Sequence, residues 1–223
     1  MVPRVEHLNR SGSAADLSTS CRQIRVEGLS HGNGVYYIRD SNMIAYPVNC
    51  DMTLGGGGWT LVASIHENNI RATGRCQSGD RWSSEHGNEQ NAKVGADNWS
   101  NYNTFGHVAS ATSDDYKNQA YFDLQVRDVM IWQVPNDTPL EEYDSSSYLQ
   151  YRTTDGFLKD YGGNLYHFYK TYFPIRAINQ EKSAYALCPF GKPHGSNGDI
   201  EHGCIGSTAD IIWTQNIVEI LQL

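Results

Sequence analysis

The stretch CDMTLGGGGWTLVASIHEN, residues 50–68, places four consecutive glycines directly before an apolar run that begins at a tryptophan. Apolar side chains alternate along residues 59–66, which is typical of a β-strand. The runs GVYYIRD (34–40) and IAYPVNCDM (44–52) are rich in β-formers and are separated only by SNM, so they predict a β-hairpin. Residues 55–58 should then connect two strands, because glycine tolerates positive φ and close backbone contact.

The rest of the chain predicts a mixed architecture. Ser20 and Gln23 form a plausible capping box for a short helix. The run AYFDLQVRDVMIWQV (120–134) predicts a strand, and NLYHFYKTYF (164–173) predicts an aromatic helix. Residues 70–118 have few apolar runs and predict long loops, which in compact domains are commonly functional or organised by ions. The fold class expected is therefore α+β with an irregular, loop-rich half.

Composition narrows the classes of function. The chain has 223 residues and a formal net charge of −8, with its acidic residues dispersed, which argues against a nucleic-acid partner. No apolar run is long enough to cross a bilayer. The polar N-terminal residues lack the apolar stretch of a secretory signal. We therefore expect no membrane span, no nucleic-acid partner and no visible export signal.

Five cysteines are present, at positions 21, 50, 76, 188 and 204. None forms a CxxC pair, so a zinc ribbon is not indicated. Because the number is odd, at least one cysteine has no partner within the chain. Disulfides would imply an oxidising compartment, whereas buried reduced thiols fit the same spacing, and the residues alone leave both open.

Catalytic motifs are not evident. The sequence has no HExxH, GxSxG or P-loop spacing, so we expect the protein not to be an enzyme. His194 and His202 suggest zinc as an alternative metal, but they do not complete a ligand set.

The segments GVYYIRD and CDMTLGGGGWTLVAS resemble the signature of fibrinogen-related C-terminal domains. HENNIRATGRCQSGDRWSSEHG, DNWSNYNTFG, ATSDDYKNQAYFDLQVRDVMIWQVPN and YRTTDGFL narrow the resemblance to the intelectins, or X-type lectins, over about residues 20–172. Members of this family are secreted, calcium-dependent glycan-binding proteins of innate immunity. The resemblance implies a fibrinogen-like α+β domain with short strands, a few helices and calcium-organised loops.

Two groups of metal ligands are implied by the resemblance. The structural calcium positions correspond to His66, Glu67, Gly79, Asp80 and Asp115. Oxygen donors of this kind suit calcium, which takes six to eight of them; His66, a poor ligand for a hard cation, would contribute its backbone carbonyl or orient a neighbour. Without the resemblance, scattered acidic side chains would more simply be solvated.

The second group lies in GDIEHGC, residues 198–204. Asp199, Glu201 and His202 match ligands of the calcium that binds sugar in this family, and Gln180 stands where the family has an asparagine. A vicinal diol replaces two waters on such an ion, so the expected ligand is an exposed terminal diol of a microbial or cell-surface glycan. Taken alone, GDIEHGC is also compatible with an ordinary acidic loop.

The resemblance also implies the cysteine pairing. Cys21 would bridge Cys50, Cys188 would bridge Cys204, and Cys76 would be a free thiol because its family partner has no counterpart. Cysteines that link family members into oligomers are absent as well, so covalent oligomers are not expected.

The resemblance departs from the family pattern after residue 172. A core stretch is absent near residues 176–178, and the family's C-terminal part is replaced by STADIIWTQNIVEILQL. We therefore divide the chain into a disordered segment (1–19), an incomplete fibrinogen-like domain (20–206) and a divergent tail (207–223). Because ligands and an aromatic pair of the family fall in the absent parts, we expect calcium and sugar binding to be weakened. A fibrinogen-related interaction protein, or a shortened product without sugar binding, is the alternative.

Overall fold

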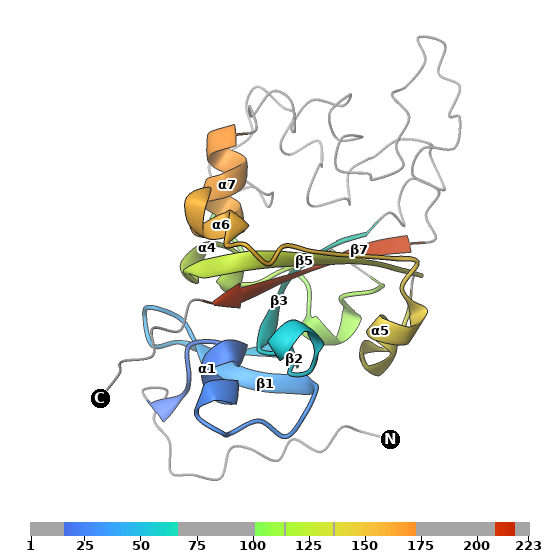
Figure 1. The fold of residues 1–223 in the computed structure, drawn as a ribbon, viewed down its shortest axis with the longest axis horizontal. Helices are drawn as coiled ribbons and strands as arrows, with labels where there is room; N and C mark the ends of the chain where they lie inside the picture. Colours follow the sequence, from blue (N-terminus) through green and yellow to red (C-terminus); the bar gives the residue numbers. More distant parts are fainter. Residues whose placement is uncertain (1–15, 67–100, 114, 136, 173–207, 217–223) are drawn as a thin grey trace.

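A computed structural model describes residues 16–66, 101–113, 115–135, 137–172 and 208–216. Within these ranges, seven strands form one sheet in the order β1-β2-β3-β7-β5-β6, with β4 also paired to β3. Every pairing is antiparallel. The mixture of short helices and an antiparallel sheet confirms the predicted α+β class (Figure 1).

The elements in chain order are α1 (Cys21–Val26), β1 (Gly34–Arg39), β2 (Ala45–Asp51), η2 (Leu54–Gly56), β3 (Trp59–His66), η3 (Val108–Ser110), β4 (Tyr116–Lys117), α4 (Ala120–Asp123), β5 (Val126–Pro135), η4 (Leu140–Glu142), α5 (Tyr143–Ser146), β6 (Leu149–Arg152), α6 (Phe157–Asp160), α7 (Leu165–Tyr172) and β7 (Thr208–Asn216). None of the helices in these ranges is both long and apolar enough to cross a bilayer.

The N-terminal part matches the prediction closely. Ser20 is the N-cap of α1, and its hydroxyl accepts a hydrogen bond from the Gln23 amide at 3.1 Å. The Gln23 side chain accepts from the Thr19 amide at 2.8 Å, one residue earlier than in the standard capping box. Residues 16–19 therefore belong to the folded part of the chain, which corrects the expected disordered segment at that end.

The predicted hairpin and glycine connection are confirmed. Strands β1 and β2 pair from Gly34 with Cys50 to Arg39 with Ala45. At Gly57 (φ +64°), a Cβ atom would collide with the carbonyl oxygen of Met52, so the turn requires glycine there. The Trp59 indole nitrogen donates to the Leu54 carbonyl at 2.9 Å, and this bond holds the turn over the buried ring.

Strand β3 is buried on both of its faces. Trp59 and Leu61 belong to one apolar cluster, whereas Val62 and Ile65 belong to another. Helices α1, α4, α6 and α7 contribute to the cluster that contains Val62, and α5 contributes to the cluster that contains Trp59. Figure 1 shows α4, α6 and α7 grouped near the beginning of β5 and α5 near its other end. The sheet is therefore the central layer between two cores.

Two further sequence predictions have different outcomes. The aromatic helix is confirmed as α7, Leu165–Tyr172. The strand expected over 120–134 is wrong at its beginning, because Ala120–Asp123 form the short helix α4 and β5 starts only at Val126. In α4, Ala120 and Tyr121 are both buried, as adjacent positions on the inner side of one helical turn can be.

The C-terminal tail supplies a central strand. Strand β7 lies between β3 and β5, and Ile212 pairs with both Ala63 and Ile131 (Figure 1). The Ile212 side chain is 3% exposed and belongs to the same core as Val62. The segment that we expected to be a divergent tail after the domain is, over residues 208–216, part of the domain's sheet.

Candidate cation-binding site

The last residues of β3 and the first residues of β4 bring two predicted calcium positions to one end of the sheet. Strand β4 pairs with β3 through Ser64 with Tyr116 and Ala63 with Lys117. Continuing this register by one residue places Asp115 beside Ile65, the neighbour of His66. His66 itself is the final residue of β3, and its backbone pairs with β7. Both predicted positions therefore lie beside segments that the structure does not describe and that the sequence predicts to be loops.

Asp115 is held in a tightly packed environment. Its residue is 2% exposed, and a Cβ atom at Gly106 (φ +73°) would collide with its carbonyl oxygen. Phe105, next to Gly106, forms an isolated antiparallel bridge with Lys117. Glycine at 106 thus lets the segment before η3 approach β4 closely. A carboxylate is the donor type that calcium prefers.

Lys117 in β4 is buried, which the sequence did not predict, and its side chain binds the segment that begins at Asn101. It is 1% exposed, and its Nζ donates to the carbonyl and the side-chain oxygen of Asn101, both at 3.1 Å. The same ammonium group lies 5.3 Å from the ring centroids of Phe105 and Tyr121. A cation over two aromatic faces is stabilised electrostatically. Nothing in the spacing of SDDYKNQAYFD distinguishes this lysine from an exposed one.

Asn118 forms hydrogen bonds with β3 at the point where the pairing of β3 with β7 is irregular. The register of β3 with β7 shifts between Leu61 and Ala63. The Asn118 backbone amide donates to the Val62 carbonyl at 3.2 Å. The Asn118 side-chain nitrogen donates to the Leu61 carbonyl at 2.8 Å. Its side-chain nitrogen also donates to the Tyr116 hydroxyl at 2.8 Å. Burial raises the pKa of Tyr116 well above its ordinary value, and this hydrogen bond opposes part of the shift. Asn118 therefore satisfies carbonyls that a regular ladder would otherwise pair.

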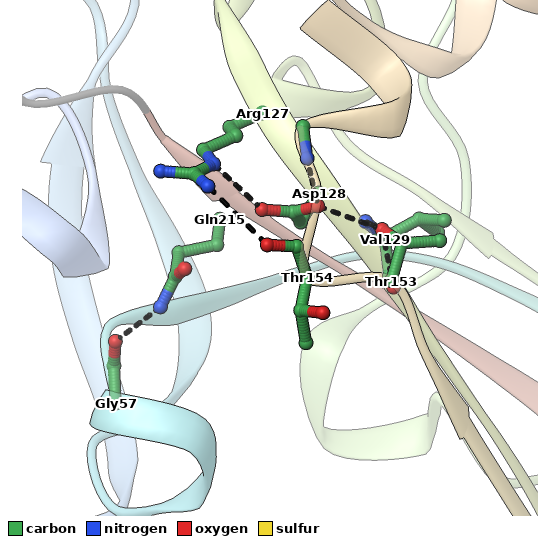
Figure 2. Close-up of polar contacts among 8 residues, drawn as sticks. Gly57, Arg127, Asp128, Val129, Thr153, Thr154 and Gln215 are labelled. Carbon is green, nitrogen blue, oxygen red and sulfur yellow. Dashed lines mark hydrogen bonds and ion pairs between the residues drawn. The ribbon is translucent and has the colours of Figure 1, made fainter.

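A third polar cluster anchors the chain after β6. The buried carboxylate of Asp128 accepts from the Thr153 hydroxyl and the Gly156 amide, each at 2.9 Å, and pairs with Arg127 Nε at 3.0 Å (Figure 2). Arg127 also donates to the Thr154 carbonyl at 3.2 Å. These bonds hold residues 153–156 against β5. The sequence prediction missed Asp128, because an acidic residue between strand positions gives no sign of its partners.

Most of the predicted ligands fall in parts of the chain that the structure does not describe. Within the described ranges there is no group of three or more His, Cys, Asp or Glu side chains able to hold a metal. Of the first group, only Asp115 has a described side chain, and His66 has a described backbone. Outside the described residues lie Glu67, Gly79, Asp80, Gln180, Asp199, Glu201 and His202. The described residues therefore do not test the predicted calcium set, and both the ion and its ligands stay a prediction.

The cysteine predictions divide in the same way. Cys21 and Cys50 form a disulfide with a Cα–Cα distance of 5.6 Å, as the resemblance implied. This bond ties α1 to β2 inside the core, where both residues are fully buried. The expected Cys188–Cys204 bridge and the free Cys76 thiol lie outside the described residues.

No protein-family model matches the chain. Among solved structures, the chain is similar to the "Fibrinogen-like globe domain of human ANGPTL6", with 11% sequence identity. The match covers 91% of this chain and 96% of that chain, at a TM-score of 0.39. A likeness at this TM-score is too weak to support a conclusion about the function of the chain.

Proposed function

We propose that this protein is a calcium-dependent, non-catalytic lectin of the fibrinogen-like class that acts outside the cell. The observation that supports the proposal is the meeting of β3 and β4, which places Asp115 next to the end of the strand that leads into Glu67. The motifs on both sides of this junction are those that resemble the intelectins. The Cys21–Cys50 disulfide is consistent with an oxidising compartment.

In this proposal, calcium would be held by two groups of oxygen donors. His66, Glu67, Gly79, Asp80 and Asp115 would bind a structural ion that orders the loops. Asp199, Glu201 and His202, with Gln180, would bind the ion that contacts sugar. When bound, this second ion supplies coordination positions that two adjacent hydroxyls of a glycan can occupy. The expected ligand is therefore a terminal vicinal diol.

A shortened product that does not fold is a further alternative, and the structure bears on it. Strand β7 occupies the position between β3 and β5, so neither strand presents an unpaired edge along that ladder. Unpaired edges and exposed apolar surface would favour aggregation. A folded sheet is therefore available to carry the proposed loops.

A binding screen against glycans with and without exocyclic diols tests the proposed function. We expect weak binding to diol-bearing glycans in calcium and no binding after chelation. Asp115→Asn should raise the calcium concentration needed for half-maximal binding by about tenfold, because a charged ligand is lost. Asp155→Asn removes an exposed carboxylate elsewhere and is the matched control.

Equal signals in calcium and in chelator would reject the lectin proposal. A folded protein that binds no glycan under either condition would favour the alternative of a fibrinogen-related interaction protein.

A further inference from the structure

Three arginines converge on the glycine turn from two separate elements. A Cβ atom at Gly55 would collide with the guanidinium group of Arg152, which comes from β6. A Cβ atom at Gly57 would lie 2.6 Å from Nε of Arg25, in α1. Arg22, one turn earlier in α1, donates from Nη1 to the Gly57 carbonyl at 3.2 Å. The three cationic groups therefore surround one short turn.

Most of their hydrogen-bonding capacity is not used. Arg25 donates through Nε to the Met52 carbonyl at 3.1 Å, which leaves both terminal nitrogens without a partner in the described part of the chain. The Arg152 side chain makes no hydrogen bond to any described residue, and the Arg22 side chain uses only Nη1. Arg25 and Arg152 are exposed, and Arg22 is half-buried.

Charge at this turn is not balanced locally. Among the residues that the structure describes, none of the three arginines forms an ion pair with a carboxylate, whereas Arg127 pairs with Asp128. Burial and the neighbouring Arg25 charge both lower the pKa of Arg22. Such an unpaired basic cluster is notable in a chain with a net charge of −8. The overall acidity disfavours a partner that contacts much of the surface, as nucleic acid does, and leaves this cluster suited to an anionic group that binds at one point.

The turn itself is rigidly placed. The Gly57 carbonyl accepts hydrogen bonds from Arg22 and from Gln215 Nε2 of β7, the latter at 2.7 Å (Figure 2). The Gly58 amide donates to the Asp51 carbonyl at 2.7 Å. The backbone against which the guanidinium groups lie is therefore fixed by β2, α1 and β7 together. Preorganised donors lose less entropy when a ligand binds.

We propose that Arg22, Arg25 and Arg152 form a second, calcium-independent site that binds a sulfate or phosphate ester group of a carbohydrate ligand. Guanidinium groups bind oxyanions through paired N–H donors. A tetrahedral ester has three terminal oxygens and up to two charges, which three converging cations match better than they match a carboxylate. The site uses none of the predicted calcium ligands.

Binding to immobilised dextran sulfate in EDTA and low salt tests this site, with uncharged dextran as the reference surface. The chain should bind dextran sulfate and not dextran, and inorganic sulfate or phosphate should compete. The ion that competes at the lower concentration identifies the preferred ester. Arg25→Gln/Arg152→Gln should weaken binding by about tenfold, because two charged donors are lost. Lys159→Gln, at an exposed position of α6, should leave it unchanged.

Absence of dextran sulfate binding, competition by neither ion, or equal binding by the double variant and Lys159→Gln would overturn the proposal. The single variant Arg152→Gln is the control for misfolding of the double variant, because the Arg152 side chain makes no hydrogen bond to a described residue. It should weaken binding while the circular dichroism spectrum is unchanged. Because chelator is present throughout, failure of the calcium-dependent lectin proposal would leave this result unaffected.

Discussion

One sheet contains two kinds of strand. Strands β1, β2 and β3 are adjacent in the sequence, whereas β7, which pairs with β3, is distant from them in the sequence. The first three follow one another in the chain and are joined by a short hairpin loop and the glycine turn. Strand β7 reaches the same sheet from far along the sequence: Gly57 and Gln215, which share a hydrogen bond, are 158 residues apart. Local turn chemistry therefore builds one region, and long-range pairing builds the other.

This difference predicts where the fold is most sensitive. The hairpin region has a cap, a disulfide and a constrained turn to hold it together. Strand β7 depends on pairing and burial with β3 and β5, and closure of a long loop is unfavourable until those contacts form. Damage to β7 should therefore affect the whole sheet, whereas damage to one local feature should have a smaller effect.

The largest effect is expected from Ile212→Asp in β7. This change puts a charge into the core beside Ala63 and Ile131, so the free energy of unfolding should fall by about 4 kcal/mol or more. Leu149→Asp on β6, where the side chain is 57% exposed, should change it by less than about 0.5 kcal/mol. Urea denaturation measures both. Equal stability of the two variants would show that β7 is not a core strand.

A smaller effect is expected from removal of the disulfide. Cys21→Ala/Cys50→Ala opens a link between residues 29 positions apart, and the free energy of unfolding should fall by about 3 kcal/mol. The main cause is the greater conformational freedom of the unfolded chain. Denaturation of the variant and the parent under non-reducing conditions provides the comparison. If the two midpoints coincide, the bridge does not stabilise the hairpin region.

The smallest effect is expected at the glycine turn. Gly57→Ala forces a side chain into positive φ and against the Met52 carbonyl, so it should cost about 2 kcal/mol. Gly28 has a similar φ, +71°, but a Cβ atom there meets nothing within 4 Å. Gly28→Ala should therefore cost only about 1 kcal/mol, from backbone strain alone. Thermal unfolding of the two variants separates strain from collision, and an equal loss would show that close packing at Gly57 is unimportant.

The features that sequence could predict are those determined by neighbouring residues. Ser20 with Gln23 indicated the start of α1, and the glycines before Trp59 indicated a strand connection. The position of β7 could not be predicted, because the apolar residues of STADIIWTQN do not reveal which strands they will pair with. Burial of Lys117 and Asp128 depends likewise on partners distant in sequence, Asn101 for one and Thr153 for the other. The candidate calcium site was suggested only by family resemblance.

Thermal unfolding in calcium and in chelator tests the central claim that a divalent ion shapes the loops next to β3 and β4. At saturating calcium, we expect the midpoint of the parent protein to rise by about 5 °C or more relative to chelator. The rise should be much smaller for Asp115→Asn and unchanged for Asp155→Asn. A midpoint of the parent protein that is the same in calcium and in chelator would contradict the account.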